Sequence, residues 1–327
     1  MTILAVKNSP ADFIEGNFTS FVVAETLTAR YAPYLSEAAR FTTERGKCEF
    51  AESSSFWVSF YAYIADTGWF TGDYIFELFL GSTSLFRFNA TVNEEITFQY
   101  KNSSNNFVTF GSAVGGTQNT LVRWDLQFVL AASGGAIRVY REGSLVAELT
   151  GNTSLGSVGI TTADNLLIGA HTVTTNVTIS ALIVSTTDTR QMFVNQLPVN
   201  AAGSNSGFTG SVADVDELGM PNDNDFLSST TLGVTSTFNA GNHSSFFNTG
   251  YTVEAVVVTA RALGEPDKYL RPVVLSGGTL GEGIGTQLDL SRSPLQHVFS
   301  TDPATGIGWT LSGVNAAEVG VKLADSA

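Results

Sequence analysis

Residues 134–151 read GGAIRVYREGSLVAELTG, with apolar and polar side chains alternating on either side of the Glu-Gly pair at 142–143. Alternation with a period of two is typical of strands that bury one face. Ile137 and Val139 begin the apolar face, and glycine supplies the positive φ that a tight turn requires. The return strand continues that face with Leu145, Ala147 and Leu149. The stretch therefore predicts a β-hairpin with an apolar inner face and a polar outer face.

The same alternation recurs in both directions from this hairpin. SFWVSFYAYIA (55–65) places Phe56, Val58 and Phe60 on one face and Trp57 and Tyr61 on the other. The predicted strands are 55–65, 73–81, 84–90, 94–100, 105–111, 122–130, the two strands of the hairpin, 165–170 and 176–185. Short strands spaced at about ten residues are typical of an antiparallel sandwich, so we predict an all-β fold.

The composition changes near residue 197. LPVNAAGSNSGFTG (197–210) is rich in glycine, serine and asparagine, which favours a linker or a long surface connection. A second group of predicted strands follows at 251–262, 269–276, 294–300, 306–313 and 318–324. A chain of 327 residues exceeds the usual size of a single core. We therefore predict two domains, a sandwich over 1–197 and a linker plus a smaller antiparallel β domain over 198–327.

Charge and cysteine content exclude several classes of function. Sixteen basic and thirty acidic residues give a net charge of −14, and no basic run stands out, so we expect no nucleic-acid binding. No apolar run approaches the ~20 residues of a membrane span, so we expect no membrane insertion. Cys48 is the single cysteine, which excludes an intrachain disulfide and a cysteine-based zinc cluster. MTILAVKNSPADF, at the start, lacks the pattern of a signal peptide, so we expect synthesis in a cytoplasm.

Three phrases of the first domain resemble the concanavalin-A/laminin-G-like jelly roll. They are FWVSFYAYI, TLVRWDLQFVLAASGGAIRVYREGSLVAELTG and NVTISALIVSTTDTRQM. Three later phrases resemble the end of uncharacterised structural proteins of tailed bacteriophages, in which a lectin-like sandwich precedes a second β domain. They are FTGSVADVDELGMPNDNDFLSS, YTVEAVVVTARA and FSTDPATGIGWTLSGVNAAEVGVKLA. Together the likeness covers most of residues 15–327.

This resemblance implies a virion protein, made in the cytoplasm of the host bacterium and carried on a tail fibre, spike or baseplate appendage. The lectin-like domain would serve adhesion to a host-surface glycan, or assembly with other virion proteins. We also expect a homo-oligomer, a trimer or higher, for which the polar-aromatic face of Trp57, Tyr61 and Tyr63 is a candidate contact. The alternatives are a capsid decoration, cement or head-fibre protein and, in another class, a glycan depolymerase.

The sequence offers no obvious catalytic constellation. Glycosidases of this fold need two carboxylates on one face, about 5–9 Å apart, whereas neighbours such as Glu94 and Glu95 point to opposite faces of a strand. A Gly-x-Ser-x-Gly elbow and a phosphate-binding loop are also missing from the sequence. We therefore predict that the chain is not an enzyme.

ADTGWFTGDY (65–74) is the candidate glycan or partner loop. Trp69 and Phe70 stand between two Thr-Gly pairs, and Asp66 and Asp73 are close by in the sequence. Sugar sites combine an exposed aromatic platform with polar groups, which is the pattern here. The alternative is that the loop folds back and Trp69 closes the end of the sandwich.

An acidic stretch beyond the predicted linker is the candidate metal site. It contains Asp214, Asp216, Asp223 and Asp225, and Ca²⁺ prefers such carboxylate oxygens. The spacing does not match an EF-hand loop, and the alternative is a solvated acidic connection or a subunit contact. We expect no other cofactor.

Overall fold

The computed structural model describes residues 2–7, 39–41, 45–65, 74–91, 95–115, 120–169, 176–216, 224–241 and 252–327. The chain divides into two compact units, Met1–Val194 and Asn195–Ala327. The boundary expected from the sequence stood after residue 197.

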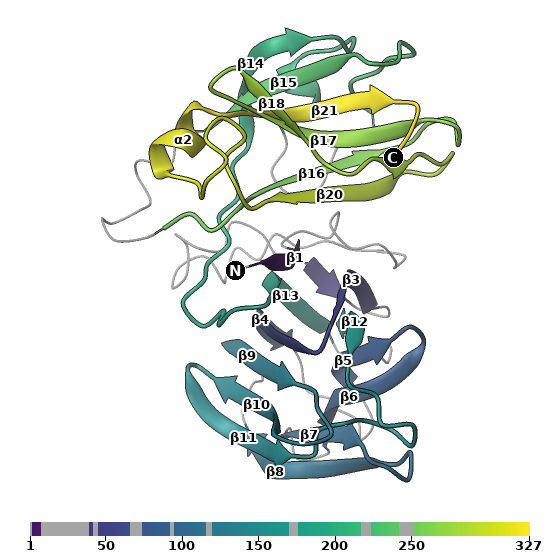
Figure 1. Ribbon diagram of the computed structural model, residues 1–327, viewed down its shortest axis with the longest axis vertical. Helices are drawn as coiled ribbons and strands as arrows, with labels where there is room; N and C mark the ends of the chain where they lie inside the picture. The colour runs from purple at the N-terminus through teal and green to yellow at the C-terminus, as the bar shows by residue number, and fades with distance from the viewer. Residues whose placement is uncertain are drawn as a thin grey trace. The chain divides into compact units, whose positions relative to one another are not determined.

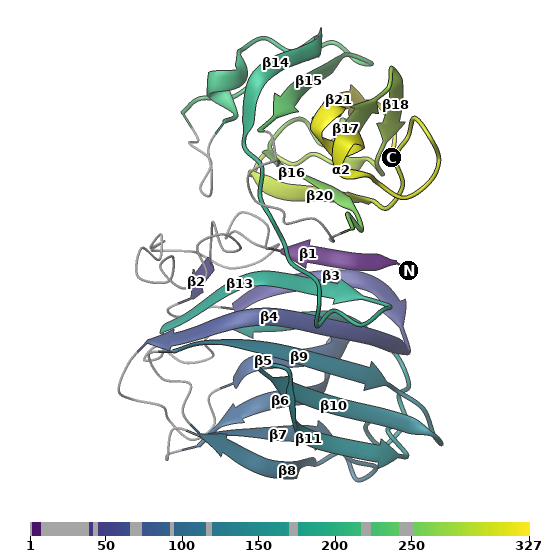
Figure 2. The ribbon, with the colours of Figure 1, turned by 90° about the vertical axis from the view of Figure 1, so that its left-hand side faces the viewer.

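The first unit contains two antiparallel sheets (Figure 1). Sheet A has the order β1 (Ile3–Lys7), β13 (Asn176–Ser185), β4 (Ser55–Ala65), β9 (Leu121–Val129), β10 (Gly135–Arg141) and β11 (Ser144–Gly151), with β2 (Ala39–Phe41) beside β13. Sheet B has the order β3 (Arg45–Ser53), β12 (Ala163–Gly169), β5 (Tyr74–Leu80), β6 (Thr83–Ala90), β7 (Glu95–Lys101) and β8 (Phe107–Gly115). Figure 2 shows β4, β9, β10 and β11 side by side in one layer, with β5 to β8 in the layer behind.

Aromatic side chains fill the space between these two layers. Phe60 of sheet A stacks on Phe76 of sheet B with 5.7 Å between ring centroids, and Phe88 of sheet B meets Trp124 of sheet A edge-on at 5.2 Å. Each of these rings is at most 1% exposed. The apolar face of each predicted strand therefore supplies one wall of a shared core, and the predicted all-β, jelly-roll-like architecture is confirmed.

The hairpin of β10 and β11 forms as predicted, with one difference. Glu142 and Gly143 occupy its turn with φ of 49° and 78°, the pair of positive values that a two-residue hairpin loop requires. A bulge then places Leu145 opposite Tyr140, whereas Ala147 lies opposite Val139. Paired residues share a face of the sheet. Leu145 is consequently on the outer face and 49% exposed, not on the apolar face as expected.

The second unit is also built from antiparallel strands. Its larger sheet has the order β14 (Val199–Ser206), β15 (Thr235–Ala240), β21 (Glu318–Ala324), β17 (Tyr269–Ser276) and β18 (Thr279–Glu282), with β19 (Thr286–Gln287) beside β17. A second pair consists of β16 (Val256–Ala262) and β20 (Ser293–Phe299). A 3-10 turn, η2 (Val212–Asp214), and a short helix, α2 (Leu311–Ala316), complete the described elements. In the parts of the chain that the structure describes, no helix has the length and apolarity of a membrane span.

Two segments of this unit differ from expectation. The predicted linker 197–210 contains β14, which pairs with β15 in the sheet. Glu318 of β21 adds to this by accepting hydrogen bonds from the backbone N and the Oγ of Ser204, at 2.7 and 2.5 Å. The predicted strand 306–313 instead leads into α2, whose first turn is capped by Thr310. Trp309, just before it, is buried and donates its indole N–H to the carbonyl oxygen of Phe299 at 2.7 Å. Pairing with β15 thus overrides the loop propensity of β14, whereas α2 begins at a local cap.

Candidate functional site

The predicted glycan loop falls outside the described residues. Asp66, Trp69, Phe70 and Asp73 all belong to the segment 66–73, which joins β4 to β5. Its role as a binding loop stays a prediction.

The predicted calcium site is only partly described. Asp214 lies in η2, where its carboxylate accepts hydrogen bonds from the backbone N and the Oγ of Ser211, at 2.6 and 3.1 Å, and so caps the turn. Asp216 and Asp225 are also described, whereas Asp223 is not. Within the described residues, no three Asp, Glu, His or Cys side chains gather into a group that could hold a metal ion. Calcium binding stays a prediction.

The structure instead places a pocket of about 440 Å³ on the outer face of sheet A. Its floor contains Tyr61 of β4 together with Arg123 and Asp125 of β9. The rest comes from the β10–β11 turn and from residues 186–194, which follow β13 and which we call the strap. Arg123 and Asp125 share a face because residues two apart in a strand point the same way.

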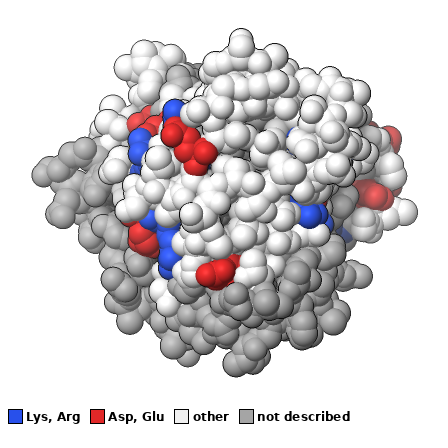
Figure 3. Space-filling view, turned by 90° about the horizontal axis from the view of Figure 1, so that it is seen from below, with Lys and Arg blue, Asp and Glu red and all other residues white. Residues whose placement is uncertain are grey.

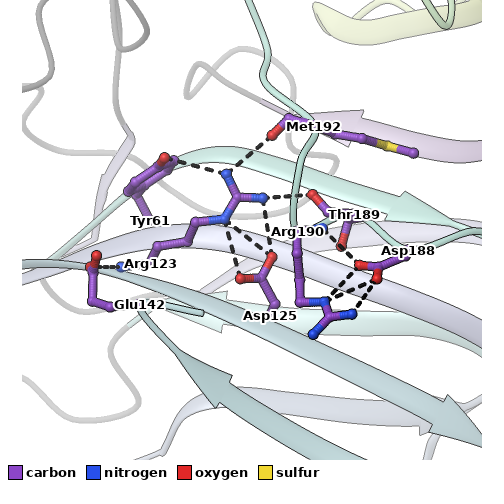
Figure 4. Close-up of polar contacts among 8 residues, drawn as sticks. All are labelled: Tyr61, Arg123, Asp125, Glu142, Asp188, Thr189, Arg190 and Met192. Atoms are coloured by element: carbon purple, nitrogen blue, oxygen red, sulfur yellow. Dashed lines mark hydrogen bonds and ion pairs between the residues drawn. The ribbon is translucent and has the colours of Figure 1, made fainter. Parts of the chain in front are cut away.

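Arg123 fixes the strap to the sheet (Figure 4). Its Nη2 donates to the carbonyl oxygen of Thr189 at 2.6 Å, and its Nη1 donates to the carbonyl oxygen of Met192 at 3.1 Å. Nη1 also reaches the Tyr61 hydroxyl at 3.3 Å, and Nε bonds both carboxylate oxygens of Asp125 at 3.2 Å. The guanidinium thus uses its donors on two strands and on the strap, and it is only 8% exposed.

Asp125 is the buried acid of this arrangement. It is 1% exposed, and burial raises the pKa of its carboxyl although the hydrogen bonds from Arg123 act in the opposite direction. For Arg123, burial alone would lower the pKa. The hydrogen bonds and charges of Asp125 and Tyr61 outweigh burial, so the pKa of Arg123 is raised. A carboxyl with a raised pKa in the wall of a pocket is a feature of functional sites. Here both of its oxygens are already bonded by Arg123, which suits a rigid floor.

Arg190 of the strap forms one wall of the pocket. Its guanidinium carbon lies 5.1 Å from the centroid of the Trp57 ring and 4.6 Å from that of Tyr140, within the range of cation–π contact. Hydrogen bonds to Asp188 raise the pKa of Arg190, and those same bonds outweigh burial to lower the pKa of Asp188. Trp57 and Tyr61 are 8% and 7% exposed, so two rings of the face expected to form a subunit contact are buried within the chain, whereas Tyr63 is half-buried.

The rim carries groups that could contact a ligand. Glu142 bonds the backbone N of Arg123 through Oε1 at 2.7 Å, and Gln191 is exposed with no side-chain hydrogen bond to any described residue. Phe193 also lines the pocket and is 36% exposed. The strap and the β10–β11 turn therefore bring an aromatic ring, an amide, carboxylates and a guanidinium together above a floor of strand residues. Such a set suits a hydroxyl-rich ligand.

Sequence reasoning missed this site, although part of the signal was visible. VRWDLQFVL (122–130) places opposite charges two residues apart on its polar face, where Arg123 and Asp125 can pair. The phrase was interpreted only as a marker of the fold. Which segment covers these charges is not encoded locally, because Thr189 lies 66 residues from Arg123.

Charges on the face drawn in Figure 3 are few. Lys and Arg side chains lie scattered there, several of them beside Asp or Glu, and the described part of that face has no large basic area.

Comparison with known proteins gives likeness at the level of fold. No protein-family model and no curated protein matches the sequence. Among solved structures, an endo-β-1,4-glucuronan lyase from the fungus Trichoderma reesei is 14% identical, covering 57% of this chain and 96% of its own, with a TM-score of 0.42. A mutant of alginate lyase Aly36B in complex with an alginate tetrasaccharide is 7% identical, covering 57% and 99%, with a TM-score of 0.37. Caenorhabditis elegans galectin LEC-6 is 15% identical, covering 45% and 95%, with a TM-score of 0.31.

These comparisons correct the prediction that the chain is not an enzyme. Two of the structures that it resembles are lyases, so a chain of this fold class is not excluded from catalysis. The missing glycosidase carboxylates, serine elbow and phosphate loop exclude those three chemistries and no others. At these TM-scores the likeness assigns no activity to this chain.

Proposed function

We propose that this chain is a glycan-binding structural protein of a tailed-bacteriophage virion, carried on a tail fibre, spike or baseplate appendage. The pocket on the outer face of sheet A carries the glycan part of the proposal. Its volume of about 440 Å³ lies within the usual range for ligand sites, ~300–1,000 Å³. The lectin-like sandwich is a scaffold that presents such a face.

The rim chemistry supports a sugar over an apolar ligand. Arg190 still has Nη1 without a hydrogen bond to any described residue, and the Gln191 amide offers both a donor and an acceptor. Phe193 supplies an exposed ring on which the C–H face of a sugar can pack. Because Arg123 and Asp125 satisfy one another beneath these groups, the floor would stay fixed while a ligand binds.

The virion part of the proposal is supported by the sequence resemblance of the C-terminal half to phage structural proteins. The same resemblance supports a homo-oligomer, a trimer or higher, in contact with other virion proteins. Since the strap covers Trp57 and Tyr61, the contact between subunits would use another surface.

Glycan binding is tested with the full chain on an array of bacterial surface oligosaccharides, followed by calorimetry of the hits. Gln191→Ala and Phe193→Ala should each weaken binding several-fold, whereas Gln296→Ala in the second unit serves as a matched control and should not. Binding that both pocket variants leave unchanged would contradict the proposed site. Shortening of the oligosaccharide during the same incubations would show that the site also catalyses cleavage.

The place in the particle is tested by cryo-electron microscopy of assembled virions. We expect density for this chain on a tail appendage. Density on the capsid lattice would make it a decoration or cement protein, and its absence from purified virions would contradict the virion assignment. Native mass spectrometry of the purified chain measures the oligomeric state.

A further inference from the structure

The outer face of sheet B carries a row of polar side chains on adjacent strands. Glu77 of β5 is paired with Arg87 of β6, Arg87 with Gln99 of β7, and Gln99 with Thr109 of β8. Cross-strand partners share a face, and here it is the face away from the aromatic core. This row belongs to a different sheet from the pocket described above.

Arg87 is held firmly in the middle of this row. Its Nε donates to Oε1 of Gln99 at 2.7 Å, and its guanidinium carbon lies 4.1 Å from the centroid of the Tyr74 ring and 3.8 Å from that of Phe107. Two aromatic contacts and one hydrogen bond restrict the side chain to a single orientation. Little conformational entropy would then be lost when a ligand binds.

The terminal nitrogens of Arg87, Nη1 and Nη2, make no hydrogen bond to any residue that the structure describes. The adjacent carboxylate is engaged elsewhere. Glu77 accepts hydrogen bonds from Arg45 Nη1 at 2.6 Å and from Ser84 Oγ at 2.5 Å. Lys101 adds a second positive charge, with Nζ at 5.6 Å from the Phe107 ring centroid. Among the described residues of this region, Arg45, Arg87 and Lys101 thus stand beside the carboxylate of Glu77, although the chain as a whole carries −14.

We propose that Arg87 is the recognition residue of a second binding site, on the outer face of sheet B, for the carboxylate of an acidic sugar. A fixed, planar guanidinium whose two terminal nitrogens bond no described residue matches the two oxygens of a carboxylate. The neighbouring hydroxyls and amides of Thr109 and Asn89 suit sugar hydroxyls, and the rings of Tyr74 and Phe107 suit the apolar face of a sugar. This site is independent of the pocket on sheet A.

The test uses the full chain, a hexamer of galacturonate, and the same hexamer after its carboxyl groups have been reduced to alcohols. Calorimetry should detect binding of the acidic hexamer and a loss of about tenfold or more in affinity for the reduced one. Arg87→Gln should produce a similar loss for the acidic hexamer. Arg87→Lys, which keeps the charge but not the planar fork, should also lose most of the affinity.

Arg138→Gln is the matched control, because it removes the same charge from the outer face of sheet A and should leave the affinity for the acidic hexamer unchanged. Failure of the parent chain to bind the acidic hexamer, equal binding of the reduced one, or full affinity in Arg87→Gln would each overturn the inference. Equal affinity for a sulfated neutral hexamer would overturn the assignment to a carboxylate. Gln191→Ala leaves sheet B intact, so its effect reports on the pocket of sheet A alone.

Discussion

Replacing Arg123 by Met should destabilise the first unit strongly, because Asp125 would keep its burial and lose its partner. The side chain of Arg123 makes six hydrogen bonds, three to Asp125 and one each to Tyr61, Thr189 and Met192. The two side chains are 10% and 1% exposed, so the pair is a buried one. Breaking a buried ion pair by removing one partner costs about 3–5 kcal/mol.

For a unit of this size, that loss corresponds to a decrease in Tm of about 6–20 °C. The loss should depend on pH. Burial already raises the pKa of Asp125 in the folded state, and removing Arg123 raises it further. The folded state of the variant would bind the proton more tightly than the unfolded state does. Its stability relative to the parent should therefore recover as the pH falls toward the unfolded pKa of about 3.9.

The assay is thermal and urea unfolding of the full chain at pH 8 and at pH 5. Hydrogen–deuterium exchange of peptides from β4 and β9 assigns the transition to the first unit. The double variant Arg123→Met with Asp125→Leu is the control, since removing both charges should restore part of the stability. Each kcal/mol of lost stability corresponds to ~2–4 °C in Tm for a unit of this size. The reasoning would therefore be refuted by a single variant that melts within about 2 °C of the parent at pH 8. It would also be refuted by a double variant less stable than the single one.

Two further predictions concern the second unit. Gly320→Ala should lower its free energy of unfolding by about 1–3 kcal/mol or more, because a Cβ at that position would lie 1.9 Å from the carbonyl oxygen of Ser236. Gly308→Ala, with no atom within 4 Å of its new Cβ, should leave urea unfolding unchanged, and equal effects of the two substitutions would contradict the packing argument. Burial lowers the pKa of His297, so the unfolded state gains a proton first as the pH falls below about 6.5. The stability of the second unit should therefore decrease between pH 7 and pH 5, and His297→Gln should flatten that dependence in urea titrations.

The strands of the sandwich could be predicted because their alternation has a direct physical cause. The predicted bounds of 55–65 coincide with β4, in which Phe56, Val58 and Phe60 line the core. Leu145 was placed on the wrong face because a bulge shifts the register by one residue, and no local pattern signals it. β14 was missed because serine, asparagine and glycine favour loops, whereas pairing with β15 and contacts with Glu318, more than a hundred residues away, hold this strand in the sheet.

The candidate sites were less accessible to sequence reasoning than the fold. Arg87 interrupts the apolar alternation of SLFRFNA (84–90), and this charge was a usable signal for the outer face. The sequence does not show which side chains surround Arg87 in the folded chain. Tyr74 and Phe107 come from strands on either side, and they approach Arg87 only once the register of three strand pairs is set.

The strap has a mechanical consequence, because it is the last stretch of the first unit before the chain continues into the second. Tension applied at Asn195 would load the contacts of Arg123 and Arg190 before it reached the ladder of β13. These contacts lie at successive points along the strap and would therefore break one after another, starting at its C-terminal end. Fully extended, residues 186–194 span about 30 Å. Under a pull from the C-terminus, detachment of the strap should therefore lengthen the first unit by less than about 30 Å before its strands separate.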